Sequence, residues 1–473
     1  METYLITVSK YLLIALMLFY TWECFSALKS KNPIKQAGIY QRQNGVIFLV
    51  YLIGMAMVFF NEKEVPQINV IILAGAQLCF LIIVLGVFPV IYTNINKAIL
   101  SNMCMLLTIG FIMLARLDYQ GSITQFIIVA IVTLLSLIVP YLMQKEDFLK
   151  KLTWLYCLVG ACLLLVVLAM GVISRGAKLS MEIGGFTFQP SEFVKILFVF
   201  FLAGFFAKAT DFKRVIISAI LAGMFVFLLV LSTDLGSALI FFMIYLFMLY
   251  VATKKARYLW LGFGGMSLAS VIAYGLFSHV QTRVEAWQDP WSIIDGKGYQ
   301  ITQSLFALSN GGFTGTGLYH GQPTDIPVVK KDFVFSAIGE EFGGIIGMLL
   351  ILICLSCFIA FLITAMRQLS MFNRLICIGL GIQYAVQVIL TVGGALKMIP
   401  STGVTLPLIS YGGSSILSTL FVFAIIQGLA IVGTNNEGVV IGKRLDDDIE
   451  TKPKKNKKKK GKSIEHTQEL PKL

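Results

Sequence analysis

The sequence predicts an all-α, polytopic bundle of membrane-spanning helices, and two features of its composition support that prediction. Of its 473 residues, 57% are hydrophobic and only 13% are charged, whereas soluble domains average roughly 25% charged residues. The apolar residues also gather in long runs, and about 20 consecutive apolar residues are enough for a helix to cross a bilayer. We therefore expect a multi-pass membrane protein.

Cutting the chain into runs of about that length predicts thirteen spans. Their approximate limits, in chain order, are 5–28, 46–60, 67–92, 98–115, 122–143, 152–173, 191–207, 214–231, 234–252, 258–278, 335–365, 375–396 and 404–433. Lys10 and Glu23 bracket the apolar part of the first run. Without that run there would be twelve helices and an N-terminus on the inner side.

The connectors between these runs alternate in basic charge. Alternate connectors are rich in lysine and arginine, and the connectors between them contain few. The rich set includes 29–42, 145–151, 208–214, 254–257 and 367–374. Cytoplasmic loops of membrane proteins carry the excess of Lys and Arg. The rich set is therefore predicted to face the cytoplasm, and the long loop 279–333 to lie outside.

The net charge of +13 does not imply a nucleic-acid partner, because much of it lies in "KPKKNKKKKGK" at 452–462. A run of like charges after the last span is typical of a disordered tail that is attracted to anionic lipid headgroups. We predict such a polybasic cytoplasmic tail at 441–473.

The three histidines share no ligand spacing and the eight cysteines lie in apolar runs, so we expect no metal site built by the protein.

Asp234, in "LSTDLGSAL", lies between two strongly apolar runs. An ionisable group at membrane depth costs about 2.5–3.5 kcal/mol on insertion scales, so its presence needs a compensating role. An aspartate at a helix start can cap free backbone N–H groups. A carboxylate in a partly dry site can also act as a general base. The two roles are compatible, and the predicted topology places Asp234 at an outer helix end.

A second polar motif is "FQPSEFVK", residues 188–195. Pro190 suits a first helical turn, and Glu192 and Lys195 share a face at i,i+3 spacing. Both charges are expected to face the bundle interior. They could form a structural ion pair, or Lys195 could contact an anionic group of a substrate.

The outer loop is too long for a simple connector, and long ordered loops are usually functional. It contains Arg283 and an amphipathic stretch at 299–308, and it is followed by "KKDFVFSAIGEEFGG". That motif brings Lys331 and Asp332 to an outer helix start, with Glu340 about two turns further in.

The last polar motif, "IPSTGVTLPLISYGGSS" at 399–415, opens the final span with two prolines and several glycines. Irregular backbone at membrane depth is tolerated only where protein or water surrounds it, so this motif indicates a polar cavity on the outer side. Its candidate substrate-binding residues are Ser410, Tyr411, Gly412, Gly413 and Ser414.

The motifs "GFTFQPSEFVK", "STDLGSAL", "RVEAW", "GYQITQSLFALSNGGFTGTGL", "DFVFSAIGEEFGG" and "IPSTGVTLPLISYGGSS" occur in this order. In this the chain resembles the SEDS family (shape, elongation, division and sporulation), the bacterial peptidoglycan glycosyltransferases of the RodA, FtsW and SpoVE type. The resemblance covers roughly residues 98–433. It implies about ten helices in a core at 98–440, preceded by about three additional N-terminal helices within 1–97.

The resemblance implies polymerisation of lipid II into glycan strands at the outer face of the bacterial cytoplasmic membrane, in cell division or cell-shape maintenance. It makes Asp234 the catalytic residue, and a class B penicillin-binding transpeptidase the partner. Lys195, Arg283 or Lys331, with or without Mg²⁺ on the substrate pyrophosphate, would then offset charge on the leaving undecaprenyl pyrophosphate.

Two features depart from the family pattern. The first is the set of additional N-terminal helices, whose role is open. The other is Ser232–Thr233, which precedes the aspartate where the motif usually has proline or glutamine-proline; this change is not expected to disturb the carboxylate. Two other functions stay open on the sequence alone, namely a lipid II flippase or ion-coupled carrier and a noncatalytic scaffold of the division machinery.

Overall fold

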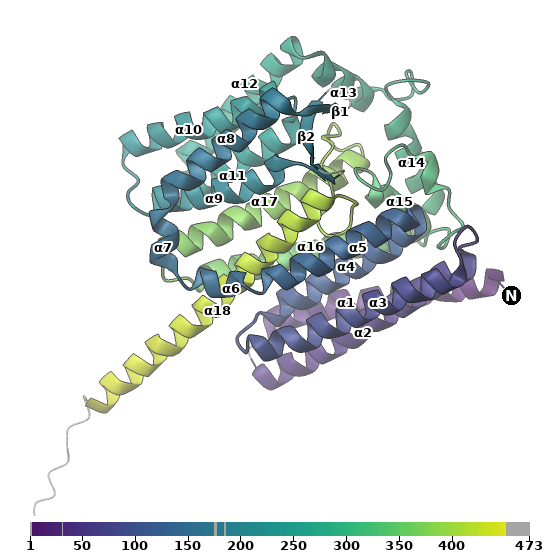
Figure 1. The fold of residues 1–473 in the computed structure, drawn as a ribbon, viewed down its shortest axis with the longest axis horizontal. Helices are drawn as coiled ribbons and strands as arrows, with labels where there is room; N and C mark the ends of the chain where they lie inside the picture. The colour runs from purple at the N-terminus through teal and green to yellow at the C-terminus, as the bar shows by residue number, and fades with distance from the viewer. Residues whose placement is uncertain (1, 31, 175–176, 184–185, 451–473) are drawn as a thin grey trace, which may run out of the picture.

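The computed structural model describes residues 2–30, 32–174, 177–183 and 186–450 as a bundle of long helices with a short sheet at one end (Figure 1). In chain order the first helices are α1 (Glu2–Lys29), α2 (Pro33–Asn61), α3 (Gln67–Ile91), α4 (Lys97–Leu117), α5 (Tyr119–Ser136), α6 (Val139–Met143), α7 (Glu146–Lys151), α8 (Thr153–Met170) and α9 (Pro190–Phe206). The later helices are α10 (Phe212–Leu231), α11 (Leu235–Thr253), α12 (Arg257–Leu276), α13 (Ser278–Gln288), α14 (Tyr299–Gly311), α15 (Val334–Glu341), α16 (Gly343–Met366), α17 (Met371–Ala395) and α18 (Gly413–Glu450).

Twelve helices among the described residues are long and apolar enough to cross a membrane, which confirms the all-α polytopic bundle. The one predicted span that is not among these twelve, 191–207, corresponds to α9, whose 17 residues are fewer than the ~20 that a full span needs. Most of α9 is buried between α8, α11, α17 and α18. Ser191 and Glu192 are buried as well, so the N-terminal end of α9 is surrounded by protein and not by lipid.

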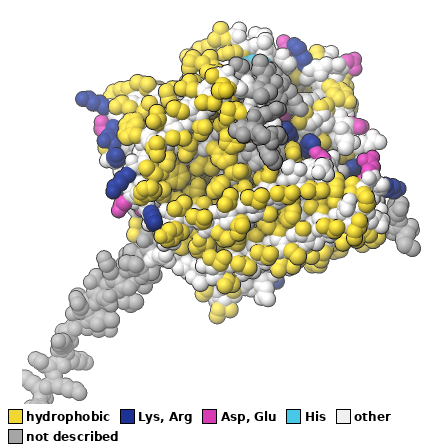
Figure 2. All heavy atoms as spheres, viewed as in Figure 1, with side chains coloured by type: hydrophobic (Ala, Val, Ile, Leu, Met, Phe, Trp, Pro, Cys, Tyr) yellow, Lys and Arg dark blue, Asp and Glu magenta, His cyan; other side chains and the backbone are white. Residues whose placement is uncertain are grey.

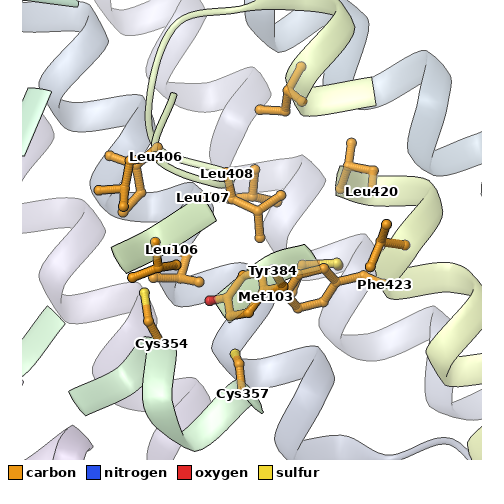
Figure 3. Close-up of a cluster of buried hydrophobic side chains, with 14 of the residues drawn as sticks. Met103, Leu106, Leu107, Cys354, Cys357, Tyr384, Leu406, Leu408, Leu420 and Phe423 are labelled. Carbon is orange, nitrogen blue, oxygen red and sulfur yellow. The ribbon is translucent and has the colours of Figure 1, made fainter. Parts of the chain in front are cut away.

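The centre of the bundle is formed by α4, α16, α17 and the first part of α18. The whole apolar window of α4 is buried. Figure 3 shows side chains of these helices meeting the irregular segment before α18, with Leu406 and Leu408 above and Tyr384 and Phe423 below. The Tyr384 and Phe423 rings pack edge to face, with centroids 5.7 Å apart.

The N-terminal helices α1, α2 and α3 pack beside α4 and α16, as Figure 1 shows along the lower edge. Buried polar groups join them to the core, because Tyr20 donates to Oδ1 of Asn102 (3.0 Å), and Asn102 donates to Oγ of Ser356 (2.6 Å). At Gly54 a Cβ atom would lie 2.4 Å from Ile112, so α2 and α4 approach closely there.

A three-stranded antiparallel sheet joins α8 to α9, which the sequence interpretation did not predict. Its strands are β1 (Val172–Ser174), β2 (Ala177–Ile183) and β3 (Phe186–Phe188), in the order β1–β2–β3. Ile183 pairs with Phe186 and Met181 with Phe188. The alternating sequence "KLSMEIGGFTF" with its Gly-Gly pair is a hairpin signal, so the sheet could have been predicted.

The loop 279–333 is largely ordered by its own helices. It contains α13, α14 and the 3₁₀ turn η1 (Pro323–Asp325). The predicted amphipathic stretch at 299–308 is confirmed as the helix α14, which packs against α15. The predicted span at 335–365 is broken at Phe342, between α15 and α16.

Charged side chains gather at two opposite ends of the molecule, with hydrophobic side chains between them (Figure 2). At one end, Asn373 donates to Oε2 of Glu146 (2.9 Å), and Asn94 donates to Asn435 (2.8 Å). The first contact joins the basic connectors 145–151 and 367–374, and Nε2 of Gln368 donates to the carbonyl oxygen of Leu429 in α18 (2.8 Å), so these connectors lie at one end of the bundle. The helix α18 continues to Glu450, past residue 440 where the core was expected to end; residues 451–473 of the predicted tail lie outside the described residues.

Candidate active site

Three helices, α9, α11 and α18, begin close together at the end of the bundle opposite the basic connectors. Ser191, in the first turn of α9, donates from Oγ to Oδ2 of Asp234 at the start of α11 (3.2 Å). The backbone N–H of Gln189, the N-cap of α9, donates to Oγ of Ser414 in the first turn of α18 (2.9 Å). The amino end of a helix carries partial positive charge, so three such ends together favour an anion.

Asp234 is half-buried and serves as the N-cap of α11, where Oδ1 accepts from the N–H of Ser237 (3.0 Å). The capping role expected from the sequence is therefore present. Thr233, directly before it, has φ of 61°, a conformation that few non-glycine residues adopt. Proline fixes φ near −65°, so the family's usual proline could not adopt this backbone.

Arg283, from α13, brings a cation to this carboxylate. Its Nη1 donates to the carbonyl oxygen of Ser401 (2.9 Å). Burial lowers the pKa of Arg283, and the negative charges of Asp332 and Asp234 oppose that change. Since a guanidinium remains protonated in proteins, Arg283 is a fixed positive charge within electrostatic range of both acids.

Gly403 lies next to the side chains of Arg283 and Asp332. Its φ of 74° favours glycine, and a Cβ atom there would lie 3.7 Å from Nη2 of Arg283 and 3.9 Å from Oδ2 of Asp332. The start of α11 adjoins this segment, because a Cβ atom on Gly236 would lie 2.9 Å from the carbonyl oxygen of Thr402. The irregular segment after α17 therefore forms one wall of the site.

Side chains from neighbouring helices hold this irregular segment in place. Gln125 of α5 accepts from the N–H of Gly412 (3.0 Å) and donates to the carbonyl oxygen of Ser410 (3.1 Å). Ser410 in turn donates to the carbonyl oxygen of Lys331 (2.6 Å), and the N–H of Tyr411 donates to that of Lys330 (2.7 Å). These contacts show protein around this broken backbone, and the polar cavity expected on the outer side stays a prediction.

Glu192 and Lys195 form a buried ion pair deeper along α9. Nζ of Lys195 donates to Oε1 of Glu192 (2.8 Å), and Ser418 of α18 donates to Oε2 (2.9 Å). The Lys195 side chain is fully buried. This geometry matches the structural ion pair, one of the two alternatives left open by the sequence.

Glu340, near the end of α15, contacts the outer loop and, among the described residues, makes no hydrogen bond or ion pair with Asp234. Its Oε1 accepts from Nδ2 of Asn310 and from the N–H of Gln322, both at 3.1 Å. The neighbouring Glu341 pairs with Nε of Arg116 (3.0 Å). These two acids therefore hold the loop residues around Gly321 against α15 and α4.

The structure therefore brings together Asp234, Arg283, Asp332, the backbone carbonyl group of Lys331 and the run from Ser410 to Ser414, and leaves Glu192, Lys195 and Glu340 in other surroundings. The side chain of Lys331 is exposed. The sequence interpretation missed Ser191, Gln189 and Gln125 as partners of the site. Ser191 lies within the motif "FQPSEFVK", beside the helix-starting Pro190, and could have been predicted. Nothing in the sequence around Gln125 indicates a functional role. Among the described residues, no three His, Cys, Asp or Glu side chains are grouped so that they could hold a metal ion.

Residues 96–434 match the family model described as a cell cycle protein of the FtsW, RodA and SpoVE type. The "Peptidoglycan glycosyltransferase RodA" of Mycobacterium tuberculosis (strain ATCC 25618 / H37Rv) is 37% identical over 273 residues, which cover 54% of this chain and 58% of that protein. The "Stage V sporulation protein E" of Bacillus subtilis (strain 168) is 30% identical over 305 residues, covering 62% and 82%. The chain thus spans well under two thirds of the mycobacterial relative's length.

Solved structures share the fold. A chain from "Structural coordination of polymerization and crosslinking by a peptidoglycan synthase complex" is 26% identical, with a TM-score of 0.60 over 72% of this chain and 98% of that one. The rod shape determining protein RodA of Thermus thermophilus has a TM-score of 0.55 at 23% identity, over 71% of this chain and 96% of its own.

Proposed function

The chain belongs to the FtsW, RodA and SpoVE family of cell cycle proteins, and on that premise we propose that it is a peptidoglycan glycosyltransferase that polymerises lipid II into glycan strands. The observation that carries the proposal is the half-buried carboxylate of Asp234, which lies where three helix N-termini meet and within electrostatic range of the guanidinium of Arg283. The names of the curated relatives support the same activity.

In this reaction the acceptor's GlcNAc 4-hydroxyl oxygen attacks the anomeric carbon of the donor sugar. The α-bond from that carbon to the undecaprenyl pyrophosphate breaks as the new β-bond forms, with inversion. Asp234 accepts the hydroxyl proton as general base. The pyrophosphate leaves with the bonding electron pair, and Arg283, Lys331 and the helix N-termini stabilise its charge. Mg²⁺ carried on the pyrophosphate would fit beside Asp234 and Asp332, because magnesium commonly takes one or two carboxylates together with phosphates.

We place this site at the outer face of the bacterial cytoplasmic membrane. The end that carries the connectors 145–151 and 367–374 is rich in Lys and Arg, and the positive-inside rule assigns such an end to the cytoplasm. The Asp234 end then faces outward, and the polybasic tail begins inside.

The partner we propose is a class B penicillin-binding transpeptidase, which would crosslink the strands that this chain makes. The support is the likeness to a chain from a peptidoglycan synthase complex that coordinates polymerisation and crosslinking. Two enzymes acting on one growing strand gain from physical association, because the product of the first is already near the second.

The test is polymerisation of lipid II by the purified protein with a cognate transpeptidase, comparing the parent with Asp234→Asn. Asparagine caps helices about as well as aspartate, so this change removes the base and keeps the cap. We expect the variant to retain its thermal stability and to lose glycan synthesis by at least 100-fold. Asp325→Asn, at an exposed acid of the outer loop, is the matched control and should polymerise as the parent does.

Equal polymerisation by the parent and Asp234→Asn would refute the catalytic assignment. Transport of lipid II in sealed vesicles without any polymerisation would favour a carrier instead. A parent that does neither, while it still binds the transpeptidase, would favour a scaffold.

A further inference from the structure

A small pocket opens at the basic end of the molecule, far from Asp234 along the bundle. It has a volume of about 220 Å³ and lies where α8 begins, α9 ends and α10 begins, at the left of Figure 1. Its lining residues are Thr153, Trp154, Phe205, Lys208, Arg214 and Ile217. Pockets that enclose a drug-sized ligand are larger, at roughly 300–1,000 Å³, so this one can take the head of a ligand but not the whole of a large one.

The polar side of the pocket is cationic. Among the described residues, Lys208 makes no hydrogen bond or ion pair. Among the same residues, Arg214 lies 3.5 Å from the carbonyl oxygen of Phe205 and from Oδ1 of Asp211, and its guanidinium lies 5.8 Å from the centre of the Phe205 ring. Most of the donors of these two side chains therefore remain available to an anion.

The surrounding surface adds to this positive charge. Residues 145–151 and 208–214 contain six Lys or Arg and three Asp or Glu, a net charge of +3. Dark blue side chains line this edge of the molecule in Figure 2.

The other side of the pocket is apolar and continues onto the lipid-facing surface. Trp154 packs edge to face on Phe205, with ring centroids 5.9 Å apart, and remains 57% exposed. Ile217 and Ile220 on α10 are 45% and 67% exposed. Tryptophan is typical of the boundary between headgroups and acyl chains, so this pocket lies where a lipid presents both its parts.

From this arrangement we infer that the pocket binds the headgroup of an anionic glycerophospholipid. The phosphate lies between Lys208 and Arg214, and the acyl chains extend along Trp154, Ile217 and Ile220. A free phosphate or sugar phosphate would satisfy the two cations but would leave the apolar walls unused. Basic pockets between membrane helices bind anionic headgroups in this way.

The experiment is the thermal stabilisation of the full-length protein in detergent by dioleoyl phosphatidylglycerol, compared with dioleoyl phosphatidylcholine. We expect the anionic lipid alone to stabilise the parent. Each basic residue near anionic lipid contributes roughly fivefold to binding. The double variant Lys208→Gln with Arg214→Gln should therefore raise the half-saturating lipid concentration about 30-fold. Lys255→Gln with Arg257→Gln removes the same charge at exposed positions outside the pocket and should change that concentration less than threefold.

A second variant, Ile217→Trp, fills the apolar wall and keeps both cations, so it tests the pocket even if the charge variant folds poorly. It should also weaken the lipid effect. The inference is overturned if both lipids stabilise the parent equally, if the 255/257 control loses as much as the 208/214 variant, or if Ile217→Trp binds as the parent does. Full competition by millimolar sn-glycerol 3-phosphate would overturn it too, because the pocket would then recognise phosphate without lipid.

Discussion

Thr233 shows how a single residue shapes the approach to Asp234. Its φ of 61° turns the chain from the end of α10 into the start of α11, and its N–H donates to the carbonyl oxygen of Val230 (3.0 Å). Residues held in sparsely populated conformations cost of order 1–3 kcal/mol and tend to occur at functional sites. The strain lies beside the carboxylate that we propose as the base.

Thr233→Pro, which restores the family's usual residue, is therefore expected to destabilise this protein. Proline cannot adopt the observed φ and removes the N–H that Val230 accepts from, at a cost of about 3 kcal/mol or more. Thr233→Gly, which tolerates the conformation, should stay within about 1 kcal/mol of the parent. Thermal unfolding of both variants in detergent checks this, and a proline variant as stable as the glycine variant would show that the backbone here differs from the one described.

Glu341 is a second residue whose surroundings set its chemistry. Its carboxylate is buried, with Oε1 held by Arg116 and by the N–H of Tyr319 (3.1 Å) and Oε2 without a partner among the described residues. Burial raises its pKa from 4.5 to about 7, against the opposing effect of Arg116, and the neighbouring Glu340 adds to the rise.

A carboxyl group whose pKa is higher in the folded state binds its proton more tightly there, so stability should fall as the pH rises from about 4.5 towards 7. The loss is on the order of 3 kcal/mol. Glu341→Gln resembles the protonated form and should flatten that part of the pH profile of the unfolding midpoint. Glu285→Gln, at an exposed acid paired with Lys297, should leave the slope unchanged; an unchanged slope in Glu341→Gln would contradict the account.

At the scale of elements, the decisive feature is an irregular segment, 400–412, supported by regular helices. Gln125 of α5 contacts both Gly412 and Ser410, and Gln387 of α17 donates to the carbonyl oxygen of Thr405 (3.0 Å). These amides satisfy backbone groups that would otherwise be unpaired at the end of the bundle. The first turn of α18 is thereby fixed next to α9.

Gln125→Ala should consequently destabilise the protein by about 2–4 kcal/mol, because one buried N–H and one buried C=O lose their partners. Polymerisation should fall as well, since the segment adjoins Arg283. Gln120→Ala, at an exposed glutamine of the same helix, should change neither property. Unfolding midpoints and polymerisation rates measured in parallel test this, and equal behaviour of the two variants would mean that Gln125 does not hold the segment.

Elements with strong periodic or apolar signals could be predicted from the sequence, and those that depend on tertiary contacts could not. The long apolar runs predicted the spanning helices, and polar motifs beside them located Asp234 and the run 410–414. The depth of Lys195 and the separation of Glu340 from Asp234 follow from how α9 and α15 pack. The spacing of residues along the sequence determines only which of them share a helix face. The tertiary packing determines which neighbouring element that face contacts.

At the scale of the whole molecule, two charged ends separated by an apolar belt define a membrane orientation. The site and the first turn of α18 lie at one end, and the proposed lipid pocket and the part of α18 around Asn435 lie at the other. The N-terminal helices extend the belt beside α4 and α16, and they also reach the outer loop, where Nζ of Lys10 donates to the carbonyl oxygen of Gly315 (2.8 Å) and Tyr319 donates to Glu62 (2.8 Å).

The proposed orientation predicts the accessibility of single cysteines to an impermeant maleimide on intact spheroplasts. Lys63→Cys should react from outside, and Lys255→Cys should react only after permeabilisation; both positions are exposed. The exposed Cys79 and Cys162 are first replaced by serine to lower the background. The reverse pattern would place Asp234 in the cytoplasm and exclude an outward-facing polymerase.

The most direct test of the central claim is a cryo-EM structure of the full chain with lipid II bound. We predict pyrophosphate density within hydrogen-bonding distance of Arg283 and the first turns of α9 and α18, and the donor's anomeric carbon near the carboxylate of Asp234. Density for the pyrophosphate at the basic end of the bundle, or walled off from Asp234 by the segment 400–412, would contradict the account.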